Sequence, residues 1–93
     1  MKILWLLSEF FGTFALVLSI LTTGNYLAIG ATLAAVIFLI GDGSGGHVNP
    51  AVSLVMLLKG SVDPGHFVGY MSMQFLGGRA AYYSWKFITE GQK

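Results

Sequence analysis

GDGSGGHVNPAVS, residues 41–53, interrupts a chain that is otherwise mostly apolar. Asn49 followed by Pro50 predicts the start of a helix, because Asn is a favoured N-cap and Pro is pre-organised for the first helical position. The apolar run behind them suffices for a short helix, residues 50–59, but is too short to cross a bilayer. We therefore expect a half-helix that starts inside a membrane, where its unpaired N–H groups must be buried in protein or line a wet cavity.

The composition indicates a membrane protein with one small domain, residues 1–93. Hydrophobic residues make up 55% of the chain, charged residues only 10%, and there are 13 glycines, which is typical of polytopic membrane proteins. There is no cysteine, so neither a disulfide framework nor a thiolate metal site nor a thiol nucleophile is expected. The basic residues are scattered singly, which argues against a nucleic-acid-binding patch.

Three further apolar segments are candidate membrane spans, of which the second, residues 26–40, is slightly short. Residues 3–22 carry one charge, Glu9, and would extend roughly 30 Å as a helix, the thickness of a bilayer core. Residues 26–40 are expected to run back as a second span, residues 41–49 to form a re-entrant loop, and residues 66–88 to form the third span. The fold class predicted is an all-α membrane protein with three transmembrane helices plus one re-entrant half-helix. The alternative of a cleaved signal peptide at residues 3–22 is disfavoured because Glu9 interrupts the apolar stretch and no typical cleavage site follows.

Three motifs, in order, resemble those of the aquaporin and aquaglyceroporin family. Residues 44–53 are similar to the family's first Asn-Pro-Ala (NPA) loop, and residues 9–13 to its first-helix E-x-x-G-T motif. Residues 70–77 are similar to its third-helix Y-x-x-x-Q-x-x-G motif. The family has two inverted repeats and two NPA half-helices, whereas this chain holds one of each. The resemblance therefore implies half of an aquaporin-like fold, which cannot enclose the pore by itself.

The resemblance assigns roles to the residues around the NPA motif. Asn49 would offer its amide N–H groups to a passing water or hydroxyl, while Pro50 and Ala51 begin the half-helix. The alternative is an ordinary N-cap whose side chain is closed on its own backbone.

The loop that precedes the motif contains Gly45, Gly46 and His47. His47 is expected to hold loop backbone in place rather than to act as a catalytic base or metal ligand, because a metal site needs several ligands and no second His lies nearby. We predict no catalytic residue, metal or cofactor, and hence no enzyme.

Two polar residues inside the predicted spans carry structural roles by resemblance. Glu9 would accept hydrogen bonds from exposed N–H groups of the re-entrant loop. The alternative for Glu9 is that its carboxylate reaches the near membrane interface. Gln74 is expected to contribute in the same way from the third span.

The pore filter implied by the resemblance departs from that of the family. In the family a valine commonly follows the first NPA motif and an arginine follows the second. This chain has only Val52 in such a position, so a homodimer would have no arginine there, and the second-span filter position falls on Ile29. An apolar constriction of this kind makes fewer hydrogen-bonding demands than an arginine ring, so small neutral solutes such as glycerol are plausible permeants beside water.

These features together predict a passive channel for water or small neutral solutes in the lipid bilayer, most simply in the cell membrane. The pore would be completed by a second copy in a homo-oligomer, inserted upside down, or by a partner half-channel. The lysines allow both orientations, because Lys2 and Lys59 would lie on one side and Lys86 and Lys93 on the other. Two alternatives remain, a non-conducting structural subunit of a larger channel and a small proton-coupled transporter with Glu9 as the titrating group.

Overall fold

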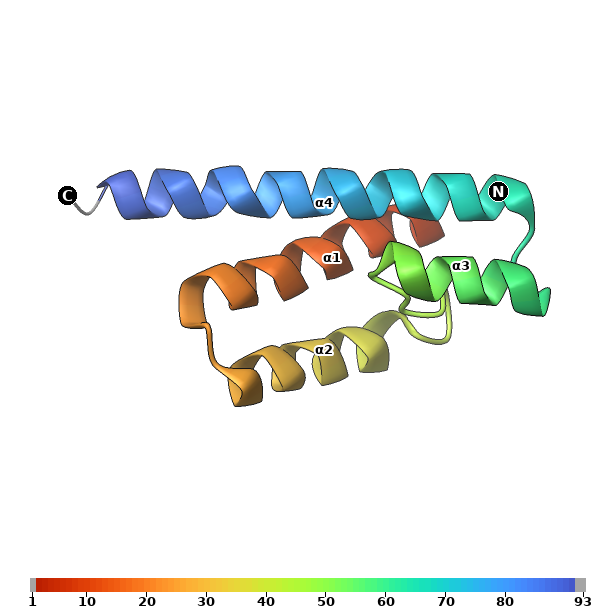
Figure 1. The fold of residues 1–93 in the computed structure, drawn as a ribbon, viewed down its shortest axis with the longest axis horizontal. Coiled ribbons are helices and arrows are strands. Elements are labelled where there is room, and N and C mark those ends of the chain that lie inside the picture. Colours follow the sequence, from red (N-terminus) through yellow and green to blue (C-terminus); the bar gives the residue numbers. More distant parts are fainter. Residues whose placement is uncertain (1, 92–93) are drawn as a thin grey trace.

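The computed structural model describes residues 2–91, so Lys93 lies outside the described part of the chain. Within residues 2–91 the ordered elements are four helices and no strands, which confirms the predicted all-α class. The helices are α1 (Ile3–Thr23), α2 (Tyr26–Ile40), α3 (Pro50–Lys59) and α4 (Pro64–Gly91). Figure 1 shows α4 along one edge of the molecule, with α1 and α2 beneath it and α3 at the end where α4 begins. The start of α1 and the end of α4 lie toward opposite ends of the long axis.

The helix ends follow local capping chemistry. Gly24, in the left-handed region at φ 54°, ends α1, and the Asn25 side chain accepts hydrogen bonds from the Leu27 and Ala28 N–H groups at the start of α2. Gly60, with φ 87°, ends α3 in the same way. A left-handed residue is the usual way to close a helix C-terminus, and Gly adopts it without a steric penalty.

The fourth helix extends beyond the predicted range of 66–88 at both ends. It begins at Pro64 because Pro suits the first helical position and the preceding residue, Asp63, caps the helix. The Asp63 carboxylate accepts the His66 N–H at 2.8 Å and lies 2.9 Å from His66 Nδ1. These bonds, led by the one from the backbone N–H, lower the pKa of the Asp63 carboxyl below its ordinary value. The turn signal in Asp-Pro-Gly is therefore also a helix start.

The closest approach between helices is that of α1 and α4, which lie side by side along most of α1. Gly77 is buried there, and a Cβ atom at this position would clash with the Phe10 carbonyl oxygen and lie 3.2 Å from the Phe14 nitrogen. Ala81, one turn further along α4, is fully buried on the same face. Small residues allow two backbones to pack directly when no hydrophobic driving force exists between helices in lipid.

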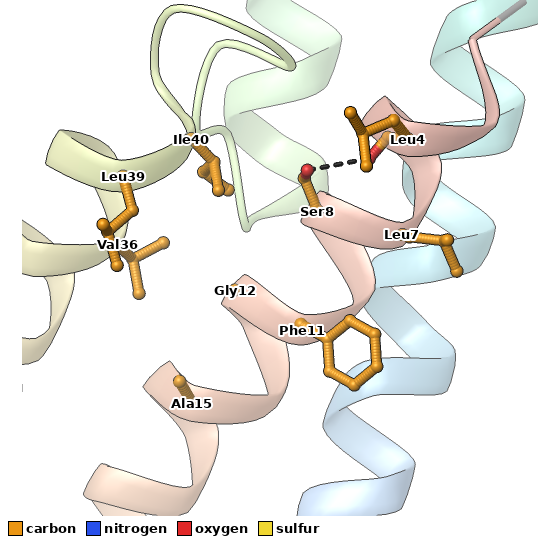
Figure 2. Close-up of a pocket in the computed structure, with 9 residues that line it drawn as sticks. All are labelled: Leu4, Leu7, Ser8, Phe11, Gly12, Ala15, Val36, Leu39 and Ile40. Carbon is orange, nitrogen blue, oxygen red and sulfur yellow. Dashed lines mark hydrogen bonds between the residues drawn. The ribbon is translucent and has the colours of Figure 1, made fainter.

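The second helix packs less tightly, against α1 alone, and Val36 is its one buried residue. Gly12 on α1 makes room for it, because a Cβ at Gly12 would lie 2.8 Å from Val48 and 3.0 Å from Val36 and from Ile40. An open cavity of about 390 Å³ remains between α1 and α2 (Figure 2). Its one hydroxyl, on Ser8, already donates to the Leu4 carbonyl at 2.7 Å, so this side chain offers a solute an acceptor oxygen but no donor.

Most of the surface is apolar. Large hydrophobic side chains are exposed on every helix, among them Ile3, Phe38, Leu58 and Phe87, each more than 70% exposed. By length and composition α1 is long and apolar enough to cross a membrane, while α2 and α3 are apolar but shorter. Exposed apolar area on this scale needs a membrane or other protein surfaces to cover it.

Gly77→Ala is expected to lower the free energy of unfolding by about 1–3 kcal/mol, the usual effect of forcing extra atoms into a packed contact. Gly78→Ala is the matched control, because its Cβ would meet only the Val17 side chain at 3.8 Å. Unfolding in mixed detergent micelles, followed by helical circular dichroism, measures both. Equal stability of the two variants would contradict the α1–α4 contact described above.

Candidate functional site

The carboxylate of Glu9 is the centre of the polar site, and it is fully buried among apolar helices. An ionised carboxylate is acceptor-only, with about four lone-pair positions on its two oxygens. Four donors surround it here. They are Ser44 Oγ at 2.8 Å and the His47 N–H at 3.1 Å on Oε2, and the Val48 N–H at 2.8 Å and Gln74 Nε2 at 2.9 Å on Oε1.

The loop before α3 follows an irregular path that this carboxylate stabilises. Gly45 and Gly46 have φ values of 99° and 64°, and Val48 has φ 46°. A positive φ is a genuine outlier for a β-branched residue and costs of the order of 1–3 kcal/mol. The Val48 N–H donates to Glu9 Oε1 at 2.8 Å, and this hydrogen bond offsets part of that strain.

The side chains of three elements meet beside the carboxylate. The Gln74 amide on α4 donates to Glu9 and also to Ser53 Oγ on α3 at 2.9 Å. Ser53 is fully buried, and its hydroxyl lies 2.8 Å from His47 Nδ1 in the loop. The orientation of the Gln74 amide is determined by the carboxylate, which needs a donor and would repel the amide oxygen. The network therefore links α1, the loop, α3 and α4.

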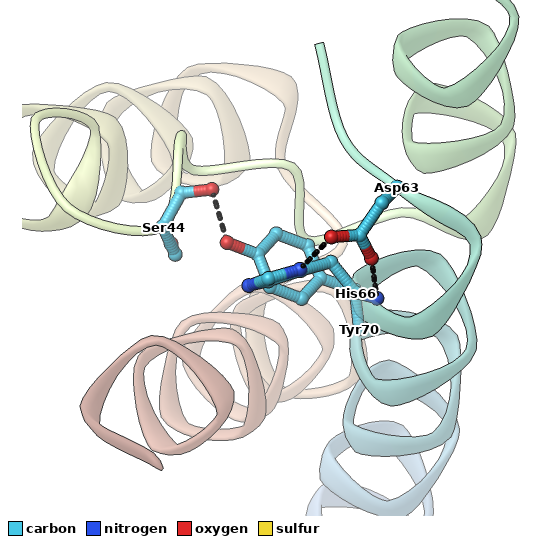
Figure 3. Close-up of polar contacts among 4 residues, drawn as sticks. All are labelled: Ser44, Asp63, His66 and Tyr70. Carbon is cyan, nitrogen blue, oxygen red and sulfur yellow. Dashed lines mark hydrogen bonds and ion pairs between the residues drawn. The ribbon is translucent and has the colours of Figure 1, made fainter. Parts of the chain in front are cut away.

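A second contact fixes the outer part of the loop. The Tyr70 hydroxyl on α4 donates to the Ser44 carbonyl at 2.8 Å, and its ring lies 5.0 Å from the His47 ring. Figure 3 shows Tyr70 reaching Ser44 beside the Asp63–His66 pair that starts α4. Tyr70 is 1% exposed, so the loop is held from the α4 side as well as from α1.

The side chain of Asn49 lies at the N-terminus of α3. Its side-chain oxygen accepts the Ala51 N–H at 2.8 Å, so it does cap α3. The side-chain nitrogen then points away from the capped backbone, and among residues 2–91 it has no hydrogen-bond partner. Asn49 is exposed. Both amide N–H groups are therefore free for an external acceptor.

The two predicted filter residues lie apart from this network. Ile29 is half-buried on α2, and Val52 is 36% exposed on α3. Within residues 2–91, α2 and α3 make no contact with each other. The structure therefore does not bring Ile29 and Val52 of one copy together.

Sequence reasoning assigned no role to three residues that the network uses, which are Ser44, Ser53 and Tyr70. Each had a usable signal. Ser53 lies four residues after Asn49 and Tyr70 lies four residues before Gln74, so each shares a helix face with a residue already singled out. Ser44 precedes two glycines in an irregular loop, whose backbone N–H and carbonyl groups need hydrogen-bond partners from side chains.

Comparisons with known proteins place this chain. The family model for the major intrinsic protein matches residues 22–93, which leaves Glu9 and most of α1 outside the match. The chain is 38% identical over 80 residues to glycerol uptake facilitator protein-like 6 of Lactiplantibacillus plantarum, covering 76% of this chain and 37% of the relative. It is 37% identical over 86 residues to human aquaporin-9, covering 76% of this chain and 29% of the relative. It is 37% identical over 89 residues to aquaporin Z of Brucella melitensis, covering 80% of this chain and 39% of the relative.

The chain thus spans 29–39% of the length of these relatives. No solved structure matches it. The predicted resemblance to the aquaporins and aquaglyceroporins is confirmed by the family model and by the names of these relatives. The chain belongs to the major intrinsic protein family.

Proposed function

We propose that this chain is half of a passive membrane channel for water or small neutral solutes such as glycerol. The observation that carries the proposal is Asn49, whose oxygen caps α3 while its amide N–H groups stay free. A donor held at the N-terminus of a short helix can orient a solute hydroxyl or a water by hydrogen bonding. The names of the relatives, two aquaporins and a glycerol uptake facilitator, support a channel of this general kind.

In this proposal α1, α2 and α4 cross the membrane, residues 41–49 re-enter it, and α3 is the half-helix. The buried Glu9 carboxylate supports such a loop, because its bonds to loop N–H groups replace the water that the bilayer core lacks. The positive end of the α3 dipole would lie near the bilayer centre and repel cations. Family membership makes the chain an integral membrane protein, and we propose the cell membrane as its location.

The other half of the pore would come from a second copy of the chain or from a partner half-channel. The ends of the described chain lie at opposite ends of the molecule (Figure 1), so a second copy could complete the channel only in the inverted orientation. Ile29 and Val52 do not meet within one copy, which fits a constriction built from two halves. Both are apolar, and this favours solutes such as glycerol beside water.

The proton-coupled transporter is the weaker alternative. A carboxylate that carries protons needs an accessible acceptor position, whereas all four positions of Glu9 already have donors and the side chain is fully buried. The second alternative is a non-conducting subunit of a larger channel. A half-channel that pairs with a second copy conducts without any partner chain, whereas a non-conducting subunit does not.

Reconstituted without a partner, the chain is expected to accelerate osmotic water or glycerol flux without conducting ions, and the rate per chain should rise with protein density as half-channels pair. Stopped-flow light scattering of vesicles at several protein densities measures the flux. A rate equal to that of empty vesicles, with insertion verified, would contradict the homo-oligomer and favour the non-conducting subunit.

Asn49→Asp is expected to reduce flux by about tenfold or more. The new carboxylate can still cap α3, but it loses both N–H donors and places a charge at membrane depth. That charge costs roughly 2.5–3.5 kcal/mol, of which the helix dipole offsets typically 0.3–1 kcal/mol.

Asn25→Asp is the matched control for this substitution. Asn25 is also an exposed Asn N-cap, since its oxygen accepts two N–H groups of α2, but it lies in the turn between α1 and α2. Flux is measured on equal amounts of folded protein. Wild-type flux for Asn49→Asp would show that the amide does not line the pore.

A further inference from the structure

A charged side chain in the middle of α4 has no part in the site described above. Arg79 lies nine residues after Tyr70, which is two and a half helical turns and thus the opposite face. The face toward α1 carries the buried residues Tyr70, Gln74, Gly77 and Ala81, whereas Arg79 is exposed. Figure 1 shows α4 at the edge of the molecule, so the outer face of α4 points away from the other helices.

The Arg79 guanidinium has no acidic partner among residues 2–91, where the two ion pairs are His66–Asp63 and Lys86–Glu90. Instead its central carbon lies 5.6 Å from the centre of the Tyr83 ring. Side chains on a helix normally lean toward the N-terminus, so the Tyr83 ring reaches back over Arg79, one turn earlier.

The aromatic residues beyond Arg79 indicate where the membrane surface lies. The Tyr82 ring centre lies 5.2 Å from that of Tyr83, edge to face, and 6.0 Å from that of Trp85, in a tilted arrangement. Tyr and Trp gather at the level of the lipid headgroups. Arg79 is three to six residues before this cluster, about 5–9 Å deeper along the helix, a depth from which a long Arg side chain reaches the membrane surface.

Lys86 is a second basic residue on the outer face of α4. It lies seven residues after Arg79, two turns further along the same side. Its one partner is Glu90, at 4.0 Å, and both side chains are about half exposed, at 49% and 60%. A surface pair with this separation leaves the ammonium available to another anion. Two cations and one acid therefore face outward beside a tyrosine.

We propose that the outer face of α4, formed by Arg79, Tyr83 and Lys86, binds the phosphate group of an anionic phospholipid in the leaflet at the C-terminal end of α4. The guanidinium fork matches a phosphate bidentately, and the ammonium supplies a second charge. The acyl chains would lie against the exposed apolar residues of the same face, Val68 and Phe75. This site is independent of conduction, since it lies on the face of α4 turned away from Glu9 and the loop.

Native mass spectrometry of the detergent-solubilised chain, titrated with phosphatidylglycerol or phosphatidylcholine, tests the site. Wild-type protein should prefer phosphatidylglycerol, and Arg79→Gln should weaken that binding about fivefold, as expected for one basic residue at an anionic surface. The affinity of the Arg79→Lys variant for phosphatidylglycerol should lie between those of the wild type and Arg79→Gln, because lysine keeps the charge but lacks the paired N–H donors of the guanidinium. Lys59→Gln, an exposed lysine at the end of α3, should leave the affinity unchanged.

A spectroscopic measurement on the wild-type chain avoids any effect of substitution on folding. In bilayers of mixed phosphatidylglycerol and phosphatidylcholine, solid-state NMR should detect dipolar coupling between lipid phosphorus and the Arg79 Cζ. Added inorganic phosphate should not abolish it, because a lipid is also held by its acyl chains.

Three results would overturn the proposal. One is equal phosphatidylglycerol affinity for wild-type and Arg79→Gln protein. Another is loss of the phosphorus coupling on addition of inorganic phosphate, which would indicate a site for free phosphate. The third is a fall in the dimer population of Arg79→Gln with unchanged lipid affinity, which would show that Arg79 pairs with a carboxylate of a second copy.

Discussion

The hydrogen bonds between the Glu9 carboxylate and the loop N–H groups are the interaction on which the rest of this structure depends. A backbone that leaves helical geometry inside an apolar environment must find partners for its N–H groups, because each unpaired group is costly. Glu9 supplies acceptors for the His47 and Val48 N–H groups in one side chain. The same carboxylate also accepts hydrogen bonds from the Ser44 hydroxyl and the Gln74 amide. It therefore fixes the loop to α4 as well. The direction of α3, and with it the position of Asn49, follows from this arrangement.

Close helix packing is what brings those partners within reach. Gly77 allows the α4 backbone to touch that of α1 next to Phe10, one residue after the carboxylate. Gly12 allows Val48, Ile40 and Val36 to lie against the same turn of α1. Larger residues at these two positions would push α4 and the loop away from Glu9. The polar network and the small residues are thus two parts of one constraint.

Local chemistry made part of this predictable from the sequence. An Asn-Pro pair before a short apolar run indicates a helix start, and α3 begins at Pro50. The helix α4 begins at Pro64, two residues before the expected start, because Asp63-Pro64 is a turn signal that also caps a helix. Glu9 and Gln74 were singled out through a family resemblance, because nothing in their local sequence says which groups they meet. The partnership of Ser53 with His47, and of Tyr70 with Ser44, depends on how helices distant in sequence pack, and periodicity alone does not contain that information.

Amide hydrogen exchange at His47 and Val48 tests the central role of Glu9 most directly. In the Glu9→Gln variant one carboxylate oxygen becomes a donor group facing other donors, so two charge-assisted bonds worth about 1.5–3 kcal/mol each are lost or weakened. Exchange at these two amides, measured by NMR in lipid nanodiscs, should then accelerate by about tenfold or more, while amides in the middle of α1 and α4 keep their wild-type rates. Unchanged exchange at His47 and Val48 would show that the carboxylate does not hold the loop, and would contradict the account.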